Sequence, residues 1–213
     1  IKIFEKLSAF DNIYYIRSLL LLGIYHQGVG NFRLAEQYSL KAYSIAKDYN
    51  PDDSSTLSTI LVSLGMHNLL QNKLQDAEMY LLEAEELGQY EQLSTIYSAN
   101  LTALTYLYMF QNKLDLAEEY LMKSLAYNEK IFGIDHPMYV HSVTSAAIIN
   151  FWIGDLQSAK KYIKLASNGI HRVDISNYAT LQYISAQIEF ANNNWDNPYL
   201  TPEMKGELKK KVA

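Results

Sequence analysis

The chain has 213 residues, of which 49% are hydrophobic and 19% are charged, a balance typical of a packed protein and not of a disordered one. Its net charge of -5 and its few arginines, Arg17, Arg33 and Arg172, offer no basic stripe for a nucleic-acid backbone, so we expect no nucleic-acid binding. No apolar run is long enough to span a bilayer, and cysteine is absent, which excludes disulfides and thiolate metal sites. We therefore expect a cytoplasmic protein with no membrane association.

Hydrophobic residues recur at helical spacing along the chain, and no stretch alternates with period two, so the sequence predicts helices and no sheet. Residues 1–9 indicate the tail of a helix that starts before Ile1, and we expect the chain to be a piece of a longer protein. The next apolar stretches come in pairs, each joined by a turn that contains Gly or Asn. The predicted pairs of helices are 12–27 with 32–49, 55–70 with 74–87, 91–110 with 114–131, and 137–152 with 156–168.

After the fourth pair, residues 175–212 predict a degenerate pair that closes the open end of the fold. Residues 175–191 have the pattern of one more first helix, and Thr201 with Pro202 is a strong start for a short polar helix. A last repeat that tolerates water on its outer side is what stacked repeats require.

The second helix of every pair carries one pattern: a turn residue, then Ala at the sixth place, Tyr at the ninth and a small residue at the thirteenth. The steps between the aligned alanines are 42, 40 and 42 residues, and a fixed period of this size is typical of stacked repeats that share one core. We therefore expect a single domain over 1–213. The aligned alanines are Ala35, Ala77, Ala117 and Ala159, and the aligned tyrosines, expected to pack between pairs with their hydroxyls in water, are Tyr38, Tyr80, Tyr120 and Tyr162.

Small residues also recur on the first helices, twelve places before each aligned alanine. Two small residues that face each other let two helix backbones approach closely, while larger neighbours fill the remaining space. The residues at this position are Gly23, Gly65, Thr105 and Ala147.

This pattern resembles the tetratricopeptide repeat, whose second helix has a small, a large and a small residue where this chain has Ala77, Leu81 and Ala84. Ser39 departs from it, because a large residue is expected there, and the period exceeds the usual one of about 34. The stretch 128–137, with Gly133 and His136 before a proline, resembles the linker of kinesin-light-chain-type repeats. The resemblance implies an all-α fold, a right-handed superhelix of antiparallel helix pairs whose first helices line a concave groove that holds a peptide or a segment of a partner protein.

The groove positions that the resemblance implies lie mainly fifteen, eleven and eight places before each aligned alanine. None of them is Lys or Asn, so a clamp for a partner's terminal carboxylate is not expected. Their apolar and aromatic character favours an amphipathic or hydrophobic segment as ligand. Alternatively, the same residues pack against each other or against another domain of the chain. The predicted groove residues, with Tyr106 and Met109 as the first contacts, are Leu20, Ile24, Val62, Met66, Leu69, Thr102, Tyr106, Met109, Thr144, Ile148 and Phe151.

Chemistry is not expected of this chain. Its histidines are scattered, with no two at metal-ligand spacing beside a carboxylate, and no nucleophile has a recognisable base, so we expect no metal, no cofactor and no catalysis. The leading hypothesis is a protein-interaction scaffold. Two alternatives stay open: a ligand-sensing or peptide-sensing domain of a larger bacterial regulator, and the repeat region of a multidomain enzyme such as a caspase-like protease.

Overall fold

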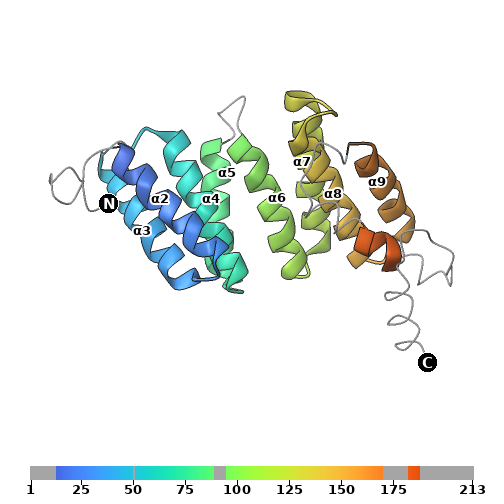
Figure 1. Cartoon of the computed structure of the whole chain (residues 1–213), viewed down its shortest axis with the longest axis horizontal. Coiled ribbons are helices and arrows are strands. Elements are labelled where there is room, and N and C mark those ends of the chain that lie inside the picture. Colours follow the sequence, from blue (N-terminus) through green and yellow to red (C-terminus); the bar gives the residue numbers. More distant parts are fainter. Residues whose placement is uncertain (1–12, 50, 89–94, 170–181, 188–213) are drawn as a thin grey trace. The chain divides into compact units, whose positions relative to one another are not determined.

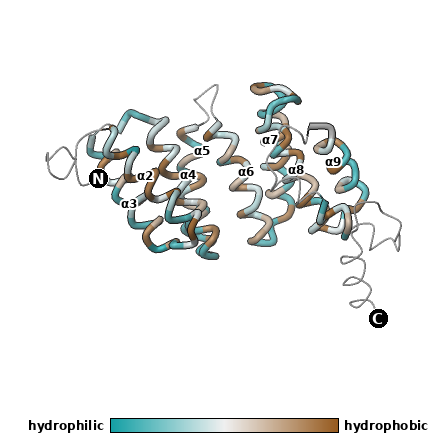
Figure 2. Tube along the Cα trace, in the orientation of Figure 1, coloured by the Kyte–Doolittle hydropathy of each residue, from teal (hydrophilic) through white to brown (hydrophobic). Residues whose placement is uncertain are grey.

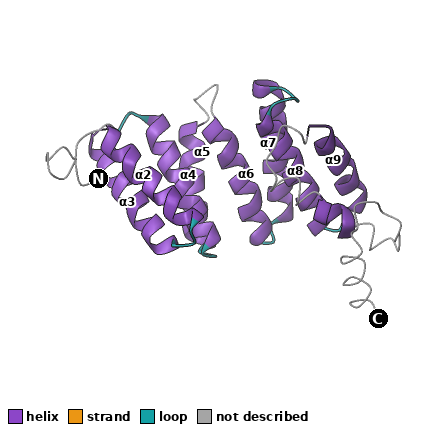
Figure 3. Ribbon diagram, viewed as in Figure 1, coloured by secondary structure: helices purple, strands orange, loops and turns teal. Residues whose placement is uncertain are grey.

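The computed structural model describes residues 13–49, 51–88, 95–169 and 182–187, and all regular structure in these residues is helical (Figures 1 and 3). The chain divides into two compact units, residues 1–120 and 121–213, and helix α7 runs across the division. The helices are α2 (Ile13–Gly28), α3 (Phe32–Tyr49), α4 (Ser54–Leu70), α5 (Leu74–Gly88), α6 (Thr95–Phe110), α7 (Leu114–Phe132), α8 (Pro137–Trp152) and α9 (Leu156–Gly169), with a further helical segment at 182–187.

These bounds confirm the predicted helix pairs and the all-α fold class. Helices α3 and α8 have the bounds expected from the sequence, and most other described ends lie within one residue of the expected ones. The segment 182–187 falls inside the extra first helix predicted at 175–191. The predicted helix tail at 1–9, the first residues of the helix predicted from 91 and most of the closing pair at 175–212 lie outside the described residues. The expectation of a single domain over 1–213 stays a prediction.

One turn joins the two helices of every pair, and it is the same turn each time. Three residues connect α2 to α3, α4 to α5, α6 to α7 and α8 to α9, and the middle residue has a left-handed backbone. In the first turn, the Gly30 N–H donates to the Gln27 carbonyl over 3.0 Å and the Asn31 N–H donates to the His26 carbonyl over 2.8 Å. These two bonds satisfy carbonyls at the helix end. The middle residues are Gly30, Asn72, Asn112 and Gly154, with φ values of 76°, 59°, 58° and 86°.

The aligned alanines occupy equivalent, fully buried places, which confirms the repeat register. Each of the four has no exposed surface, and the small residues opposite them on the first helices are buried too. Gly65 shows how close the helices are, because a Cβ atom there would lie 2.5 Å from Cγ of Leu81. The side chain of Leu81, four places after Ala77 on α5, therefore fills the space next to Gly65.

The second and the fourth pair begin with a side chain that caps the first helix. Asp53 precedes α4, and its Oδ1 accepts a hydrogen bond of 3.0 Å from the Thr56 N–H. Before α8, Gly133 ends the preceding helix in a left-handed conformation with φ of 84°, and His136 accepts from the Met138 N–H through Nδ1 over 3.2 Å. Pro137 follows as the first residue of the helix, where its missing N–H leaves no hydrogen bond unmade. The linker thus works as its Gly-x-x-His-Pro pattern indicates.

A buried polar cluster joins α7 to α8 within the second unit. Asn128 is fully buried, and its Nδ2 donates to Ser142 Oγ over 2.5 Å, while Ser124 Oγ and Ser142 Oγ lie 2.9 Å apart. Ser142 also donates to the Met138 carbonyl over 3.2 Å. Because buried polar groups without partners cost free energy, this cluster restricts the helices to the arrangement that pairs them.

The hydroxyl of Tyr120 on α7 donates a hydrogen bond to a side chain of the neighbouring pair. Tyr120 is 7% exposed, its hydroxyl donates to Glu85 Oε2 on α5 over 2.7 Å, and its ring stacks on Tyr108 at 5.3 Å between centroids. Burial first, and then the Glu85 carboxylate, raise the pKa of Tyr120, so the hydroxyl stays protonated and remains a donor. The sequence predicts that the Tyr120 hydroxyl faces water. In the structure it instead bonds to Glu85.

We expect Tyr120→Phe to lower the free energy of unfolding by about 1–2 kcal/mol, because it removes a hydrogen bond to a charged group. Urea denaturation followed by circular dichroism measures the change. Tyr49→Phe is the matched control, since Tyr49 is 48% exposed, and it should change stability by less than about 0.5 kcal/mol. Equal effects of the two substitutions would show that the bond to Glu85 contributes nothing.

Candidate partner-binding surface

The first helices of the pairs differ from the second helices in charge. Helices α4 and α6 contain no Asp, Glu, Lys or Arg, and α8 contains only His141 as a titratable cation. The second helices carry most of the charge of the described residues, and Figure 2 shows this contrast between the hydrophobic α8 and the hydrophilic α9. In the first unit α4 packs against both α2 and α6, so these three first helices form one continuous layer.

Second helices of neighbouring pairs are tied together by charged groups in the first unit. Lys73 Nζ lies 2.9 Å from Glu36 Oε2, and Lys113 Nζ lies 3.3 Å from Glu78 Oε1. Each lysine is four places before an aligned alanine, and each glutamate directly follows the preceding one. Such part-exposed pairs contribute at most about 1 kcal/mol each. These four charged groups therefore have partners within the protein.

The eleven predicted groove residues differ widely in exposure. Ile24 on α2 is the most exposed, at 49%. Five others keep only part of their surface: Met66, Tyr106, Met109, Ile148 and Phe151. The remaining five are buried: Leu20 at 8%, Val62 at 8%, Leu69 at 7%, Thr102 at 9% and Thr144 at 2%.

The structure brings some of the groove residues together within each unit. Met66 packs beside Val62 on a cluster that also contains Leu61 and Ala84. In the second unit, Ile148 and Phe151 pack against a cluster formed by Ala159 and Ile184, so part of their surface is covered by the helical segment 182–187. The buried residues thus support the partly exposed ones. Whether any of the eleven contacts a partner stays a prediction.

Sequence reasoning missed a buried polar contact between the first two pairs. His67 on α4 is fully buried, and its Nε2 lies 3.0 Å from Oγ of Ser39 on α3. Burial lowers the pKa of His67 from 6.5 to about 4, although the negative charge of Glu36 acts in the opposite direction. His67 is therefore neutral at physiological pH. The departure of Ser39 from the repeat pattern could have revealed the contact, because a small residue there leaves room for the imidazole.

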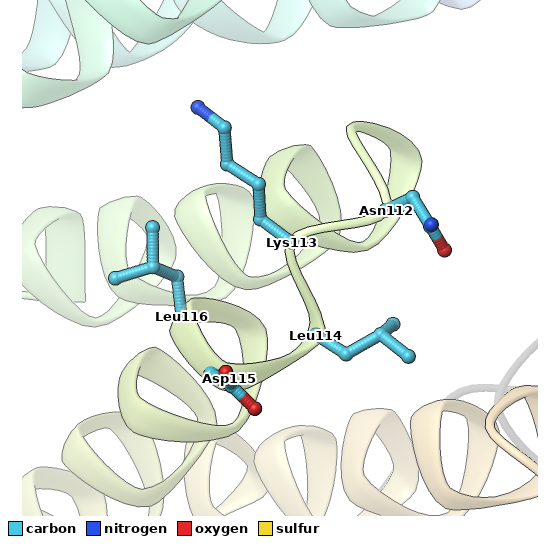
Figure 4. A pocket seen from close by; sticks show the side chains of 5 residues that line it. All are labelled: Asn112, Lys113, Leu114, Asp115 and Leu116. Atoms are coloured by element: carbon cyan, nitrogen blue, oxygen red, sulfur yellow. The ribbon is translucent and has the colours of Figure 1, made fainter.

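A pocket of about 410 Å³ lies where α7 begins (Figure 4). It is lined by residues 112–116, and Figure 4 shows Lys113 pointing away from Leu114. Leu114 and Leu116 are 41% and 37% exposed. None of the predicted groove residues lines this pocket, so it is separate from the first-helix surface.

The described residues contain neither a cluster of metal-binding side chains nor a helix of membrane-spanning character. No group of three or more His, Cys, Asp or Glu side chains there could hold a metal ion. In the same part of the chain, no helix has the length and apolar character to cross a bilayer.

Comparison with known proteins places this architecture among helical repeat proteins. Residues 101–137 match the model of the tetratricopeptide repeat family. BtubC (BKLC) from P. vanneervenii is similar in structure, with a TM-score of 0.76 and 14% identity over 93% of this chain and 81% of that one. A putative kinesin light chain of Podosopora anserina with nearly identical TPR-like repeats has a TM-score of 0.69 and 16% identity, over 92% and 96% of the two chains. A variant of that same protein has a TM-score of 0.68 and 18% identity, over 92% of each chain.

A comparison with curated protein sequences gives no match. The shared fold nevertheless defines an architecture of antiparallel helix pairs, and residues 101–137 of this chain match one tetratricopeptide repeat. The Gly-x-x-His-Pro linker resembles that of kinesin-light-chain-type repeats, and the putative kinesin light chain of the comparison has a similar fold. Repeats of this family generally mediate protein–protein interaction.

Proposed function

We propose that the first-helix surface of residues 1–120 binds an apolar segment of a partner protein. The observation that carries the proposal is the combination of partial exposure and missing charge. Met66, Tyr106 and Met109 lie eleven or eight places before an aligned alanine on the uncharged helices α4 and α6, and each keeps part of its surface exposed. Thioether and aromatic side chains of this kind are common anchors of binding surfaces.

The absence of charge on α4 and α6 restricts the chemistry of the partner. A charged group that is buried on this surface would lose its hydration and find no opposite charge on either helix. The partner segment should therefore present apolar anchors at helical spacing and keep its own charges away from the surface. Its affinity should change little with ionic strength, since salt screens charge–charge attraction and not apolar burial.

Selection from a displayed library of random peptides tests the proposal even though the natural partner is unidentified. Peptides that the protein retains should carry apolar residues three or four places apart and few charges. We expect Tyr106→Glu to weaken their binding by at least about tenfold, which is about 1.4 kcal/mol, because the substitution places an unpaired charge in the contact. Fluorescence anisotropy with the selected peptides measures the dissociation constants.

Met79→Glu is the matched control, because Met79 is 54% exposed on the second helix α5 and receives the same charge. This control should bind the selected peptides as the unmodified protein does, and circular dichroism should show equal helix content in both variants. If peptides bind equally to the Tyr106→Glu variant, the contact surface lies elsewhere. Selection of acidic or basic peptides whose binding disappears in salt would also contradict the proposal.

A further inference from the structure

Two positions of the first helix that are covered in later repeats are open in the first one. The residue fourteen places before the aligned alanine is Ala103 in the third pair and Ser145 in the fourth, each 2% exposed, and in the second pair it is Ser63, which is partly covered. In the first pair it is Leu21, which is 66% exposed. The difference is a property of the place in the repeat and not of residue type, because leucine is the more hydrophobic residue.

The residue ten places before the alanine shows the same contrast. It is 0% exposed in His67 and Leu107 and 2% exposed in Ile149, but 62% exposed in Tyr25. Single apolar residues on a surface are ordinary, whereas two large ones on neighbouring turns, at positions that the other repeats cover wholly or in part, form a packing face. We call Leu21 and Tyr25 together the end face of α2.

The structure identifies what covers these positions in the internal repeats. Helix α3 of the first pair packs on α4 of the second, and α5 packs on α6 in the same way. The contact between Ser39 Oγ and His67 Nε2 fixes the register: the residue four places after one aligned alanine meets the residue ten places before the next. The covering element is thus a second helix, and Ala42 and Ala46 of α3 lie in one buried cluster with Leu57, Ile60 and Leu64 of α4.

We propose that the end face of α2 binds one more helix of the second-helix type, in the register by which α3 covers α4. The end face continues an interface that already recurs between pairs of this chain, and this continuity defines the occupant. It is an amphipathic helix with small residues at the places of Ala42 and Ala46, which are both buried in α3 against α4.

The size of Tyr25 specifies one residue of that helix. Where the first-helix residue is the bulky His67, the second-helix residue opposite is Ser39, and the structure has a 3.0 Å contact there. Where the first-helix residue is Leu107, the second helix has Leu81 at the corresponding place. A tyrosine therefore requires a small residue opposite, as in α3, and a leucine there would overpack the contact.

The test uses a fluorescent peptide with the sequence of residues 32–49, cross-linked between successive turns because an isolated helix of this length is only marginally stable. Fluorescence anisotropy should show saturable binding to the 213-residue protein. Leu21→Glu and Tyr25→Glu should each weaken it by at least about tenfold, and Met79→Glu should leave it unchanged. A peptide with leucine in place of Ser39 should also bind more weakly.

Three outcomes would overturn the proposal. The first is no saturable binding at peptide concentrations of about 1 mM. The second is binding that Leu21→Glu and Tyr25→Glu leave intact. The third is self-association of the protein in analytical ultracentrifugation that Leu21→Glu abolishes, with no binding of the peptide, which would assign the end face to a second copy of the chain. Because Leu21 and Tyr25 are largely exposed, these substitutions should not prevent folding.

Discussion

Gly65→Ala should lower the free energy of unfolding by about 0.5–2 kcal/mol, although alanine is the better helix former. The favourable change in helix propensity is about 0.5–1 kcal/mol. Against it, the new Cβ would lie 2.5 Å from Cγ of Leu81, which is a branch point of a fully buried side chain and not a flexible end. Overpacking of a core in this way typically costs about 1–3 kcal/mol, and it is the larger effect. Urea denaturation measures the change.

The sign of this effect should reverse when Leu81 is shortened. Leu81→Ala alone should cost about 2–5 kcal/mol as a buried cavity forms. In that background Gly65→Ala should stabilise the protein, because the added methyl meets open space and the helix gains propensity. Gly28→Ala is a second control, since no atom lies within 4 Å of a Cβ built there. A loss of stability in the Leu81→Ala background would mean that another contact causes the effect.

The stability of the protein should fall as the pH drops from about 6.5 to about 4, and His67 should account for up to about 3 kcal/mol of the loss. In the unfolded chain His67 takes up a proton near pH 6.5, whereas burial delays protonation of the folded protein to about pH 4. The unfolded state thus binds more protons in this interval, and protonation favours unfolding. Well above pH 6.5 His67 is neutral in both the folded and the unfolded state, so it adds no pH dependence to the stability there.

His67→Leu isolates this effect, because Leu107 shows that leucine fits the same repeat position. Thermal unfolding measured across the interval should give a flatter pH dependence for the variant than for the unmodified protein. Carboxyl groups titrate in the same range, so the difference between the two curves is the quantity to compare. His141→Gln, at an exposed residue, should keep the full slope. Parallel curves for His67→Leu and the unmodified protein would contradict the assignment.

The fold could be predicted from the sequence because its signals are local and repeated. The aligned alanines set the register, and the Gly or Asn in each turn marks the point where the chain reverses. The contact of Ser39 with His67 could not be predicted in the same way, since it joins residues of two different pairs. The bond from Tyr120 to Glu85 was missed for the same reason, because the repeat pattern predicts a packed ring with its hydroxyl in water and does not identify a partner on the neighbouring pair.

The candidate surface was predictable only in part. Helical periodicity places the groove residues on one face, but it does not give the depth at which neighbouring helices bury them. Thr102 and Thr144 are almost completely covered, and their hydroxyls donate to carbonyls one turn earlier in the same helix, at 3.1 Å and 2.8 Å. Ile24 is half exposed, whereas the residues at the same repeat position in the other pairs, Met66, Tyr106 and Ile148, are partly covered. The packing between pairs determines how exposed each of these residues is, and this packing cannot be derived from the helical periodicity of the sequence.

The identical three-residue turn within each pair has a consequence for changes in chain length. Its middle residue must adopt a left-handed backbone, and the hydrogen bonds from that residue and the next fix the path so tightly that an added or deleted residue would rotate the second helix out of register. The step of 40 among steps of 42 shows that the chain changes length elsewhere, between one pair and the next. Affinity tags, cleavage sites or fluorescent labels would therefore be placed best between pairs, as at 51–52 before the capping residue Asp53, and insertions at 71–73 would disrupt the repeat.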